Sequence, residues 1–402
     1  MRLHWIVILV GLLVPSIFEV KRPACAFSQQ RDALPQPIRL PTKYRDQVAA
    51  LVFSPDGASL ATSGGGWRDH TVDVWQTQSS QIKYVLDAGR KSISDCAFSP
   101  DGRILATWGY GSEIKLWDAH TGRLRAMVTE PHDWVSVSIS PDSQSLATAN
   151  DKDDSVRIRS LETGLHQATI SNPTHYFKKR AYYKNAGANV AFNPNGQTIA
   201  TENAQTVYLW DAKTLKLLAT LTDPSVEIGY GPLPIFTVKG FAHGGTIYSM
   251  RFSPDGKTLA TASMDGSAKI WDASTGKLIA TLNHKGKVIR LAFSPDSQTV
   301  ATGSEDRTAC LWNVATGRLI ATLAHTGTVW SIDFSPDGEL VATAADNDHS
   351  VKVWDAKTGT LLQEFKEARY PVAFSPDGRT IATGGKDAAV LLWASPARRN
   401  SP

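Results

Sequence analysis

The chain has 402 residues, of which 42% are hydrophobic, and this composition is that of a folded protein with a large core. Its formal net charge is +4, which becomes about +2 without residues 1–26. A net charge so near zero argues against a dedicated nucleic-acid binder, which needs many basic groups to neutralise phosphates. The three cysteines, Cys25, Cys96 and Cys310, are too few for a disulfide framework, so we expect stability to come from packing, with Cys96 and Cys310 buried and unpaired.

The first 26 residues have the pattern of a secretory signal peptide. Arg2 provides a positive charge, residues 5–20 form an apolar run, and Ala24-Cys25-Ala26 matches a signal-peptidase site. We therefore predict cleavage near Ala26 and export to the periplasm or the cell exterior. The alternative is a membrane anchor formed by residues 5–20, because basic residues stand between the apolar run and the cleavage site. Residues 27–47 are polar, and we predict a spacer that includes a short strand.

A turn phrase recurs eight times in the rest of the chain, at intervals of 40 to 60 residues. It is Phe-Ser-Pro-Asp-Gly or a close variant, and it begins at Phe53, Phe98, Ile139, Phe192, Phe252, Phe293, Phe334 and Phe374. Each phrase is followed by an Ala-Thr step and then by an alternating apolar segment. That segment ends in tryptophan in seven repeats, at Trp75, Trp117, Trp210, Trp271, Trp312, Trp354 and Trp393, whereas Arg159 stands there in the third repeat.

The chemistry of one repeat predicts four short antiparallel strands. Alternation of apolar and polar residues indicates strands with one buried face. Pro, Asp and Gly in the phrase are turn residues, because proline presets φ, aspartate bonds to its own backbone and glycine accepts positive φ. One such sheet cannot bury both of its faces alone, so the repeats must stack, and stacking around an axis leaves only short edges.

These repeats resemble the WD-repeat (WD-40) β-propeller family, with Trp-Asp pairs such as Trp117-Asp118 and Trp271-Asp272, over about residues 48–394. The resemblance implies an all-β fold, a single propeller of four-stranded blades. Eight repeats predict eight blades, with residues 36–40 supplying the outer strand that the last repeat lacks; seven blades are the alternative. Residues 395–402 are then a C-terminal tail. The similarity among the repeats, together with the signal segment, indicates an exported bacterial member.

The resemblance also implies sets of hydrogen-bonded His, Thr, Asp and Trp that tie a blade together. Three repeats match this pattern, and in each the threonine of the Ala-Thr step is the expected hydroxyl partner. The sets are His243, Thr261, Asp265 and Trp271; His284, Thr302, Asp306 and Trp312; and His325, Thr343, Asp348 and Trp354. Because these histidines recur at one position of the repeat, we interpret them as structural. We predict no metal site, no cofactor and no catalytic residue, since the scattered histidines lack ligand spacing and the carboxylates near Asp153 lack the glycine and distal glutamate of a calcium loop.

The irregular repeats predict a binding surface. In this family the loops between second and third strands, and between an outer strand and the next inner strand, share one face, here called the top face. Two long insertions, 171–189 and 223–245, belong to it. Aromatic and basic residues gather in these loops and at the start of the inner strands: Trp330, Tyr248, Tyr370, Trp67, Trp108, Tyr110, Tyr176, Lys178, Lys179, Arg180, Tyr182 and Tyr183. Aromatic residues are typical of interface centres, although the insertions could instead fold back and bury them.

The sequence therefore predicts a non-catalytic scaffold that presents its top face to a protein or peptide outside the cytoplasm. A first alternative is binding of a carbohydrate or anionic polymer through Trp67, Trp108 and the tyrosines. A second is a propeller hydrolase or lyase, but this needs carboxylates or histidines converging in the central channel, and we find none in the repeats that break the pattern. Membrane contact is expected only if the signal segment is retained.

Overall fold

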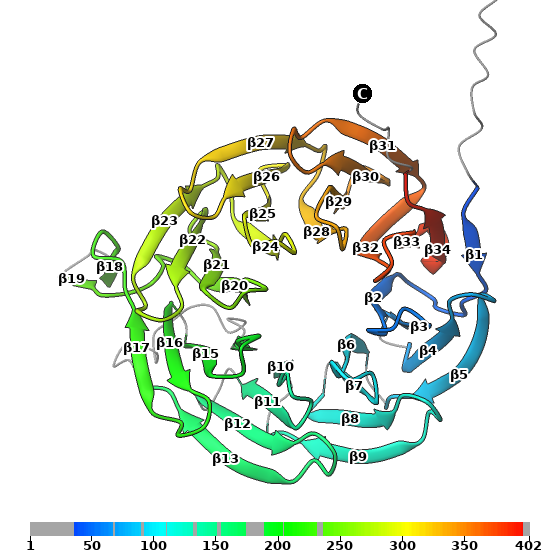
Figure 1. The fold of residues 1–402 in the computed structure, drawn as a ribbon, viewed down its shortest axis with the longest axis horizontal. Helices are drawn as coiled ribbons and strands as arrows, with labels where there is room; N and C mark the ends of the chain where they lie inside the picture. The colour runs from blue at the N-terminus through cyan, green and yellow to red at the C-terminus, as the bar shows by residue number, and fades with distance from the viewer. Residues whose placement is uncertain are drawn as a thin grey trace, which may run out of the picture. The chain divides into compact units, whose positions relative to one another are not determined.

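The computed structural model describes residues 36–66, 69–89, 92–109, 111–131, 135–150, 154–173, 189–203, 205–230 and 236–396. Between them, these residues form eight four-stranded antiparallel sheets arranged as a ring (Figure 1). The eight-bladed propeller expected from the repeats is confirmed, and the seven-bladed alternative is wrong. The predicted signal peptide, residues 1–26, lies outside the described residues, and no helix within them is long and apolar enough to cross a membrane.

The first four blades follow one another in chain order, each running from the inner to the outer strand. Blade 1 consists of β2 (Val48–Phe53), β3 (Ser59–Gly64), β4 (Thr71–Gln76) and β5 (Gln81–Asp87). Blade 2 consists of β6 (Ile93–Phe98), β7 (Ile104–Gly109), β8 (Glu113–Asp118) and β9 (Leu124–Thr129). Blade 3 consists of β10 (Val135–Ile139), β11 (Ser145–Asn150), β12 (Ser155–Ser160) and β13 (His166–Ser171). Blade 4 consists of β14 (Val190–Phe192), β15 (Thr198–Asn203), β16 (Thr206–Asp211) and β17 (Leu217–Leu221).

The last four blades complete the ring. Blade 5 consists of β20 (Ile247–Phe252), β21 (Thr258–Ser263), β22 (Ser267–Asp272) and β23 (Leu278–Asn283). Blade 6 consists of β24 (Val288–Phe293), β25 (Thr299–Ser304), β26 (Thr308–Asn313) and β27 (Leu319–Ala324). Blade 7 consists of β28 (Val329–Phe334), β29 (Leu340–Ala345), β30 (Ser350–Asp355) and β31 (Leu361–Lys366). Blade 8 consists of β32 (Ala368–Phe374), β33 (Thr380–Gly385), β34 (Val390–Ala394) and β1 (Ile38–Leu40), with a short 3-10 helix, η2 (Lys386–Ala388), before β34.

The turn phrase joins the inner strand to the second strand of each blade. In blade 5, the Ser253 hydroxyl donates to Asp255 Oδ1 at 2.6 Å and accepts the amide of Thr258 at 3.0 Å. Gly256 adopts a φ of 70°, a left-handed conformation that favours glycine. These bonds close the turn locally, which explains why a five-residue phrase is sufficient to mark each blade.

The hydrophobic core lies between neighbouring blades. One cluster joins Ile270 and Leu282 of blade 5 to Leu291, Val300 and Trp312 of blade 6, all buried. Cys96 and Cys310 are both buried and unpaired, as expected. Because each sheet packs both faces on its neighbours, no blade has a complete core of its own.

The two ends of the propeller meet in blade 8, where β1 pairs with β34 and Leu40 faces Val390. Leu40 is only 1% exposed, and the Thr42 hydroxyl donates to the carbonyl of Ala388 at 3.0 Å. The inner strands β32 and β2 also contact each other. The predicted closing strand is confirmed, and it joins the N-terminal part of the propeller to the last repeat.

The second insertion contains a hairpin of β18 (Glu227–Tyr230) and β19 (Phe236–Lys239), which projects from the outside of the ring between β17 and β23 (Figure 1). Lys239 Nζ and Glu227 Oε1 lie 2.5 Å apart across its open end. Most of the first insertion, residues 174–188, lies outside the described residues. Phe241, which follows the hairpin, is buried in the propeller.

Candidate binding face and central channel

Blades 5, 6 and 7 each contain a hydrogen-bonded set on the top face. In blade 6, His284 Nδ1 lies 2.9 Å from Asp306 Oδ2 and its Nε2 lies 2.7 Å from Thr302 Oγ1, which also accepts Trp312 Nε1–H at 2.8 Å. The same bonds join His243, Thr261, Asp265 and Trp271 in blade 5, and His325, Thr343, Asp348 and Trp354 in blade 7. Each histidine thus ties an incoming loop to the core of its blade.

The electrostatics of these sets are those of structural groups. Burial lowers the pKa of His243, so its imidazole is neutral at physiological pH. Burial alone would raise the pKa of Asp265, but His243 and the hydrogen bonds from Ser267 together outweigh it and hold that pKa well below its usual range. In the described part of the chain, no group of three or more His, Cys, Asp or Glu side chains is placed to hold a metal ion.

Other blades place a different side chain at the position of the histidine. In blade 1 it is Tyr44, whose hydroxyl lies 2.7 Å from Thr62 Oγ1. In blade 4 it is Asn172, whose Oδ1 accepts the Thr201 hydroxyl at 2.6 Å. Neither residue was predicted from the sequence, although Tyr44 stands nine residues before the turn phrase, which is the spacing of the histidines.

Blade 3 uses a buried acid at this position. Glu130 is 2% exposed, and it accepts the Thr148 hydroxyl at 2.8 Å. It forms ion pairs with Arg157 at 3.2 Å and with Arg159 at 2.9 Å. Arg159, in the place of the expected tryptophan, therefore helps Arg157 to neutralise a buried carboxylate, and it donates to the same Oε1 atom that accepts the Thr148 hydroxyl.

An aromatic pair lies at the start of the inner strands of blades 7 and 8. The rings of Trp330 and Tyr370 have centroids 6.4 Å apart, and both side chains are partly exposed. Polar bonds fix them: Trp330 Nε1–H donates to Asp346 Oδ2 at 3.4 Å, and the Tyr370 hydroxyl donates to Gln47 Oε1 at 3.2 Å. Tyr248, at the matching position of blade 5, is 37% exposed. The structure thus places three of the predicted binding residues at the top of the inner strands.

Trp108 is a correction to the predicted binding surface. It is only 9% exposed and packs in a core cluster with Leu116 and Leu146. Its strand position faces the neighbouring blade, where blades 5 and 6 have the small residues Ala262 and Gly303. The remaining predicted residues lie outside the described part of the chain: Trp67, Tyr110, Tyr176, Lys178, Lys179, Arg180, Tyr182 and Tyr183.

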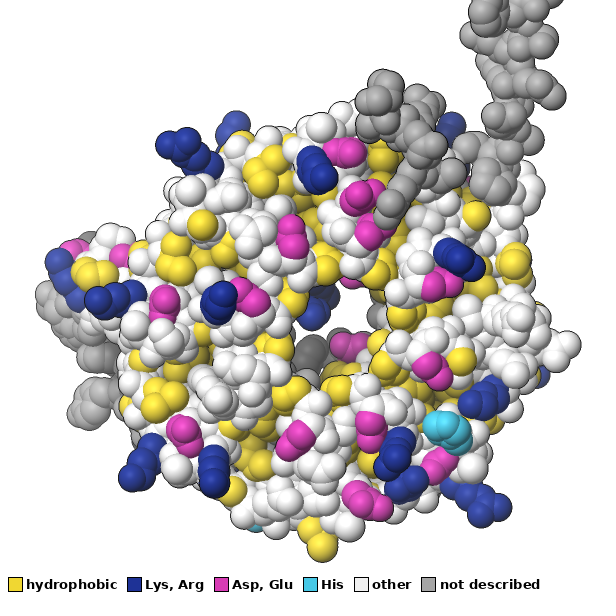
Figure 2. Space-filling model, in the orientation of Figure 1, with side chains coloured by type: hydrophobic (Ala, Val, Ile, Leu, Met, Phe, Trp, Pro, Cys, Tyr) yellow, Lys and Arg dark blue, Asp and Glu magenta, His cyan; other side chains and the backbone are white. Residues whose placement is uncertain are grey.

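The inner strands also place charged residues in the central channel: Asp95 on β6, Arg251 on β20, Arg290 on β24 and Asp333 on β28. Figure 2 shows an opening through the ring with basic and acidic side chains along its wall. The expectation that no carboxylate breaks the repeat pattern in the channel was wrong, because four of the eight repeats have Ala or Ser at the position of Asp95 and Arg290, and five have them at the position of Arg251 and Asp333. This difference between repeats was the signal that could have revealed them.

The surroundings shift the protonation of these channel groups. Desolvation raises the pKa of Asp333 to about 6. The Phe374 amide, which donates to Asp333 Oδ2 at 2.7 Å, and the charge of Arg251 both oppose this rise without cancelling it. The side chain of Asp95 is exposed to the channel, yet desolvation by the surrounding protein raises its pKa. Burial lowers the pKa of Arg290, whose Nε–H donates to the Trp330 carbonyl at 3.0 Å. The bond from Arg290 links the channel wall to the aromatic pair.

Eight four-stranded sheets around a central channel define the β-propeller class. The crystal structure of the computationally designed Ika8 protein has this fold: it matches with a TM-score of 0.67 and 19% sequence identity, over 90% of this chain and 98% of that one. The family profile "WD domain, G-beta repeat" matches residues 37–76, 80–118, 124–160, 234–272, 276–313, 317–355 and 372–394, more than half of the chain. The chain belongs to the WD-repeat family. No match covers residues 161–233, where blade 4 nevertheless forms a complete sheet.

Curated relatives share the repeats over part of their length. Protein tipD of Dictyostelium discoideum is 31% identical over 60% of this chain and 42% of its own length. WD repeat-containing protein 1 of Rattus norvegicus is 36% identical over 60% of this chain and 36% of its own. Apoptotic protease-activating factor 1 of the same species is 24% identical over 58% and 17%. The chain thus spans less than two thirds of these relatives, and WD-repeat propellers typically act as protein-interaction scaffolds.

Proposed function

We propose that this protein is a non-catalytic scaffold that binds a protein or peptide on its top face, at the mouth of the channel. The observation that supports this most strongly is the partly exposed pair of Trp330 and Tyr370, fixed by Asp346 and Gln47. A large aromatic surface held in one conformation loses little entropy on binding. Tryptophan and tyrosine are also the residues most often found at the energetic centre of interfaces.

The charges in the channel do not favour an enzyme over a scaffold. Burial raises the pKa of both Asp95 and Asp333, Arg251 opposes part of that rise in each, and Asp333 is already engaged by a backbone amide. A carbohydrate or anionic polymer remains the alternative ligand, but Trp108 is buried and does not contribute to its stacking surface.

The proposed site of action is outside the cytoplasm. The basis is the sequence of residues 1–26, which has the charge, apolar run and small-residue cleavage pattern of a signal peptide. Because few cysteines are present, the mature chain does not depend on disulfides in that compartment. We further propose that this is an exported bacterial member of the family, with a membrane anchor at residues 5–20 as the alternative to cleavage.

The test is capture from a cell-envelope extract by the mature chain, followed by titration of the purified partner. Trp330→Ala with Tyr248→Ala should weaken binding by about thirtyfold, the effect of losing one interface hot spot. The matched control is Leu319→Ala with Leu361→Ala, because these exposed apolar side chains lie on the outer strands β27 and β31. Equal capture by parent and aromatic variant, with both folded, would refute the proposal; so would the absence of any specific partner.

A further inference from the structure

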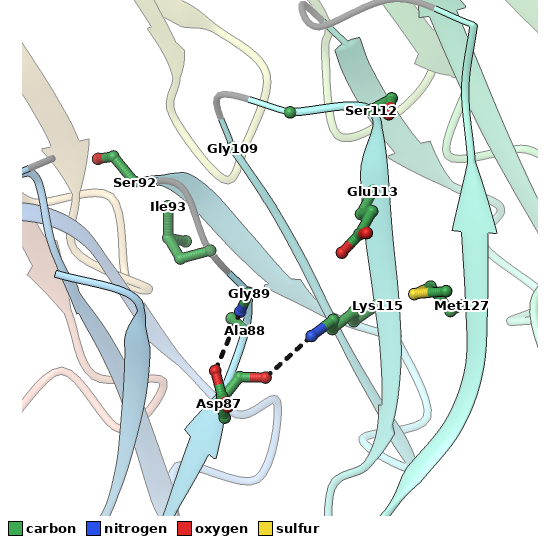
Figure 3. A pocket seen from close by; sticks show the side chains of 11 residues that line it. Asp87, Ala88, Gly89, Ser92, Ile93, Gly109, Ser112, Glu113, Lys115 and Met127 are labelled. Carbon is green, nitrogen blue, oxygen red and sulfur yellow. Dashed lines mark hydrogen bonds between the residues drawn. The ribbon is translucent and has the colours of Figure 1, made fainter. Parts of the chain in front are cut away.

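Blade 2 contains a cavity of about 510 Å³ on the top face, between the loop that enters the blade and its third strand. Its wall includes Ala88, Gly89, Gly111, Glu113, Lys115 and Met127. Figure 3 shows the carboxylate of Glu113 and the ammonium of Lys115 both directed into this space, toward the loop of Ala88 and Gly89. The volume is within the range of small-molecule sites.

The cavity lies where blades 6 and 7 place their histidine and aspartate. The backbone amide of His325 donates to the carbonyl of Arg307, which directly precedes the third strand of blade 6. The amide of Ala88 donates in the same way, at 2.9 Å, to the carbonyl of His70, which directly precedes the third strand of blade 1. Ala88 therefore has the place of the histidine. Gly111 stands thirteen residues after its turn phrase begins, the spacing of Asp306 in blade 6. Blade 2 thus lacks both side chains of the pair, and both vacated positions line the cavity.

The rest of the set is retained in blade 2. Trp117 Nε1–H donates to Thr107 Oγ1 at 3.0 Å, and Lys115 Nζ lies 5.8 Å from the centre of the Trp117 ring. Thr107 faces Lys115 across the strands, and Lys115 faces Met127, so the three side chains share the face of the sheet that borders the cavity. Lys115 Nζ also donates to the carbonyl of Asp87 at 3.1 Å.

Blade 7 shows which groups this arrangement accommodates. There Lys352 lies 5.9 Å from the ring of Trp354 and donates to the carbonyl of Ala324 at 3.0 Å, as Lys115 does in blade 2. It also pairs with the carboxylate of Asp348 at 3.1 Å, beside the imidazole of His325. A lysine at this position is therefore compatible with an imidazole and a carboxylate together, and blade 2 has neither the histidine nor the aspartate of that set.

Glu113 supplies a further contact for an imidazole. It occupies the strand position of Ser267 and Thr308, whose hydroxyls lie 3.2 Å and 3.4 Å from a histidine Nδ1 in blades 5 and 6. Glu113 Oε2 and Lys115 Nζ lie 3.7 Å and 3.9 Å from the position that a Cβ on Gly89 would have. An acceptor for an imidazole N–H and a donor for a carboxylate therefore flank the same open space.

We propose that this cavity binds a ligand with both an imidazole and a carboxylate: free histidine, or the C-terminal histidine of a peptide. The imidazole takes the vacated histidine position between Thr107 and Glu113. The carboxylate pairs with Lys115, as Asp348 pairs with Lys352 in blade 7. The cavity is larger than one side chain, which leaves room for the ligand backbone.

Calorimetric titration of the full mature chain tests the ligand class. L-histidine should bind at least about tenfold more tightly than histamine, which lacks the carboxylate, and than L-leucine, which lacks the imidazole. The dipeptide Gly-His distinguishes a peptide terminus from the free amino acid, because tighter binding than histidine identifies the peptide and weaker binding the amino acid. Absence of histidine binding at millimolar concentration, or equal binding of histidine and histamine, would overturn the proposal.

Two variants test the location. Lys115→Met retains the packing on Trp117 and should reduce histidine affinity to the level of histamine, whereas Lys277→Met, at an exposed lysine of blade 5, should leave it unchanged. The pair Ala88→His and Gly111→Asp rebuilds the set of blade 7 and should abolish binding without lowering the melting temperature. Unchanged histidine binding in Lys115→Met would exclude this cavity, and that result stands even if the double variant does not fold.

Discussion

Asp333 should make the protein less stable as the pH rises from 4 to 7. Its pKa is about 6 in the folded chain against an ordinary value of 3.8. Below pH 3.8 the folded and unfolded chains both hold the proton; between the two values only the folded chain holds it; above pH 6 the folded chain must accommodate an ionised carboxylate in a desolvated site. The difference corresponds to at most about 3 kcal/mol of unfolding free energy, and solvent in the channel reduces it to about half.

Asp333→Asn tests this sign directly. Asparagine is neutral at every pH and still offers an oxygen to the amide of Phe374, which Asp333 accepts at 2.7 Å. We therefore expect the variant to gain about 1–3 kcal/mol at pH 7 and to match the parent near pH 4, as measured by urea unfolding. Its stability should also change less than that of the parent between these pH values.

The matched control is Asp377→Asn, in a turn of the opposite face. The hydrogen bond from Ser375 lowers the pKa of Asp377, so ionisation stabilises the fold there. This contribution is present at pH 7 and is lost as the pH falls below about 4. Asp377→Asn should therefore lower stability at pH 7, in contrast to Asp333→Asn. If Asp333→Asn is also less stable than the parent at pH 7, the reasoning about desolvation in the channel is refuted.

Two further perturbations address the framework. Thr302→Val removes the hydroxyl that joins His284 and Trp312, so two buried polar atoms lose their partner. We expect the free energy of unfolding, measured in urea, to fall by about 2–4 kcal/mol. The control Thr322→Val, at an exposed position of an outer strand, should change it little. Deletion of residues 27–41 removes β1, and we expect a lower melting temperature and more aggregation by light scattering, because the edge of β34 loses its partner. A chain that starts at residue 36 is the control, and equal melting temperatures would show that closure by β1 does not stabilise the ring.

The blade count and the closing strand could be predicted because they depend on local chemistry. The turn phrase forms bonds within five residues, as Ser253, Asp255 and Thr258 show. The missing outer strand of the last repeat is visible as an absence in the sequence, and residues 36–40 were the segment available to supply it. Blade 4 follows the same rule, although its phrase is altered to Asn-Pro-Asn-Gly.

The side chains of the candidate site depend on neighbours that the sequence does not reveal. Trp108 is apolar and lies next to a loop, but the space between blades 2 and 3 buries it. In the sequence Arg159 only breaks the repeat pattern. Its role becomes visible in its ion pair with Glu130, which follows the outer strand of the preceding blade. Asp95 and Asp333 come under the influence of Arg251 only when the ring brings distant inner strands together. In each case the deciding contact crosses between blades, which a repeat-by-repeat comparison does not show.

The distribution of variation between the two faces argues for function on the top face. At the turns of the opposite face, seven blades repeat one hydrogen bond from serine to aspartate, as at Ser99 and Ser335. On the top face, the position that contacts the blade threonine varies through Tyr44, Glu130, Asn172 and histidine. The threonine stays constant beneath it, so the change of partner is not required by the fold. A ring of similar blades thus has one uniform face and one varied face. Different ligands can be distinguished only by the varied one, where both the aromatic pair and the blade 2 cavity lie.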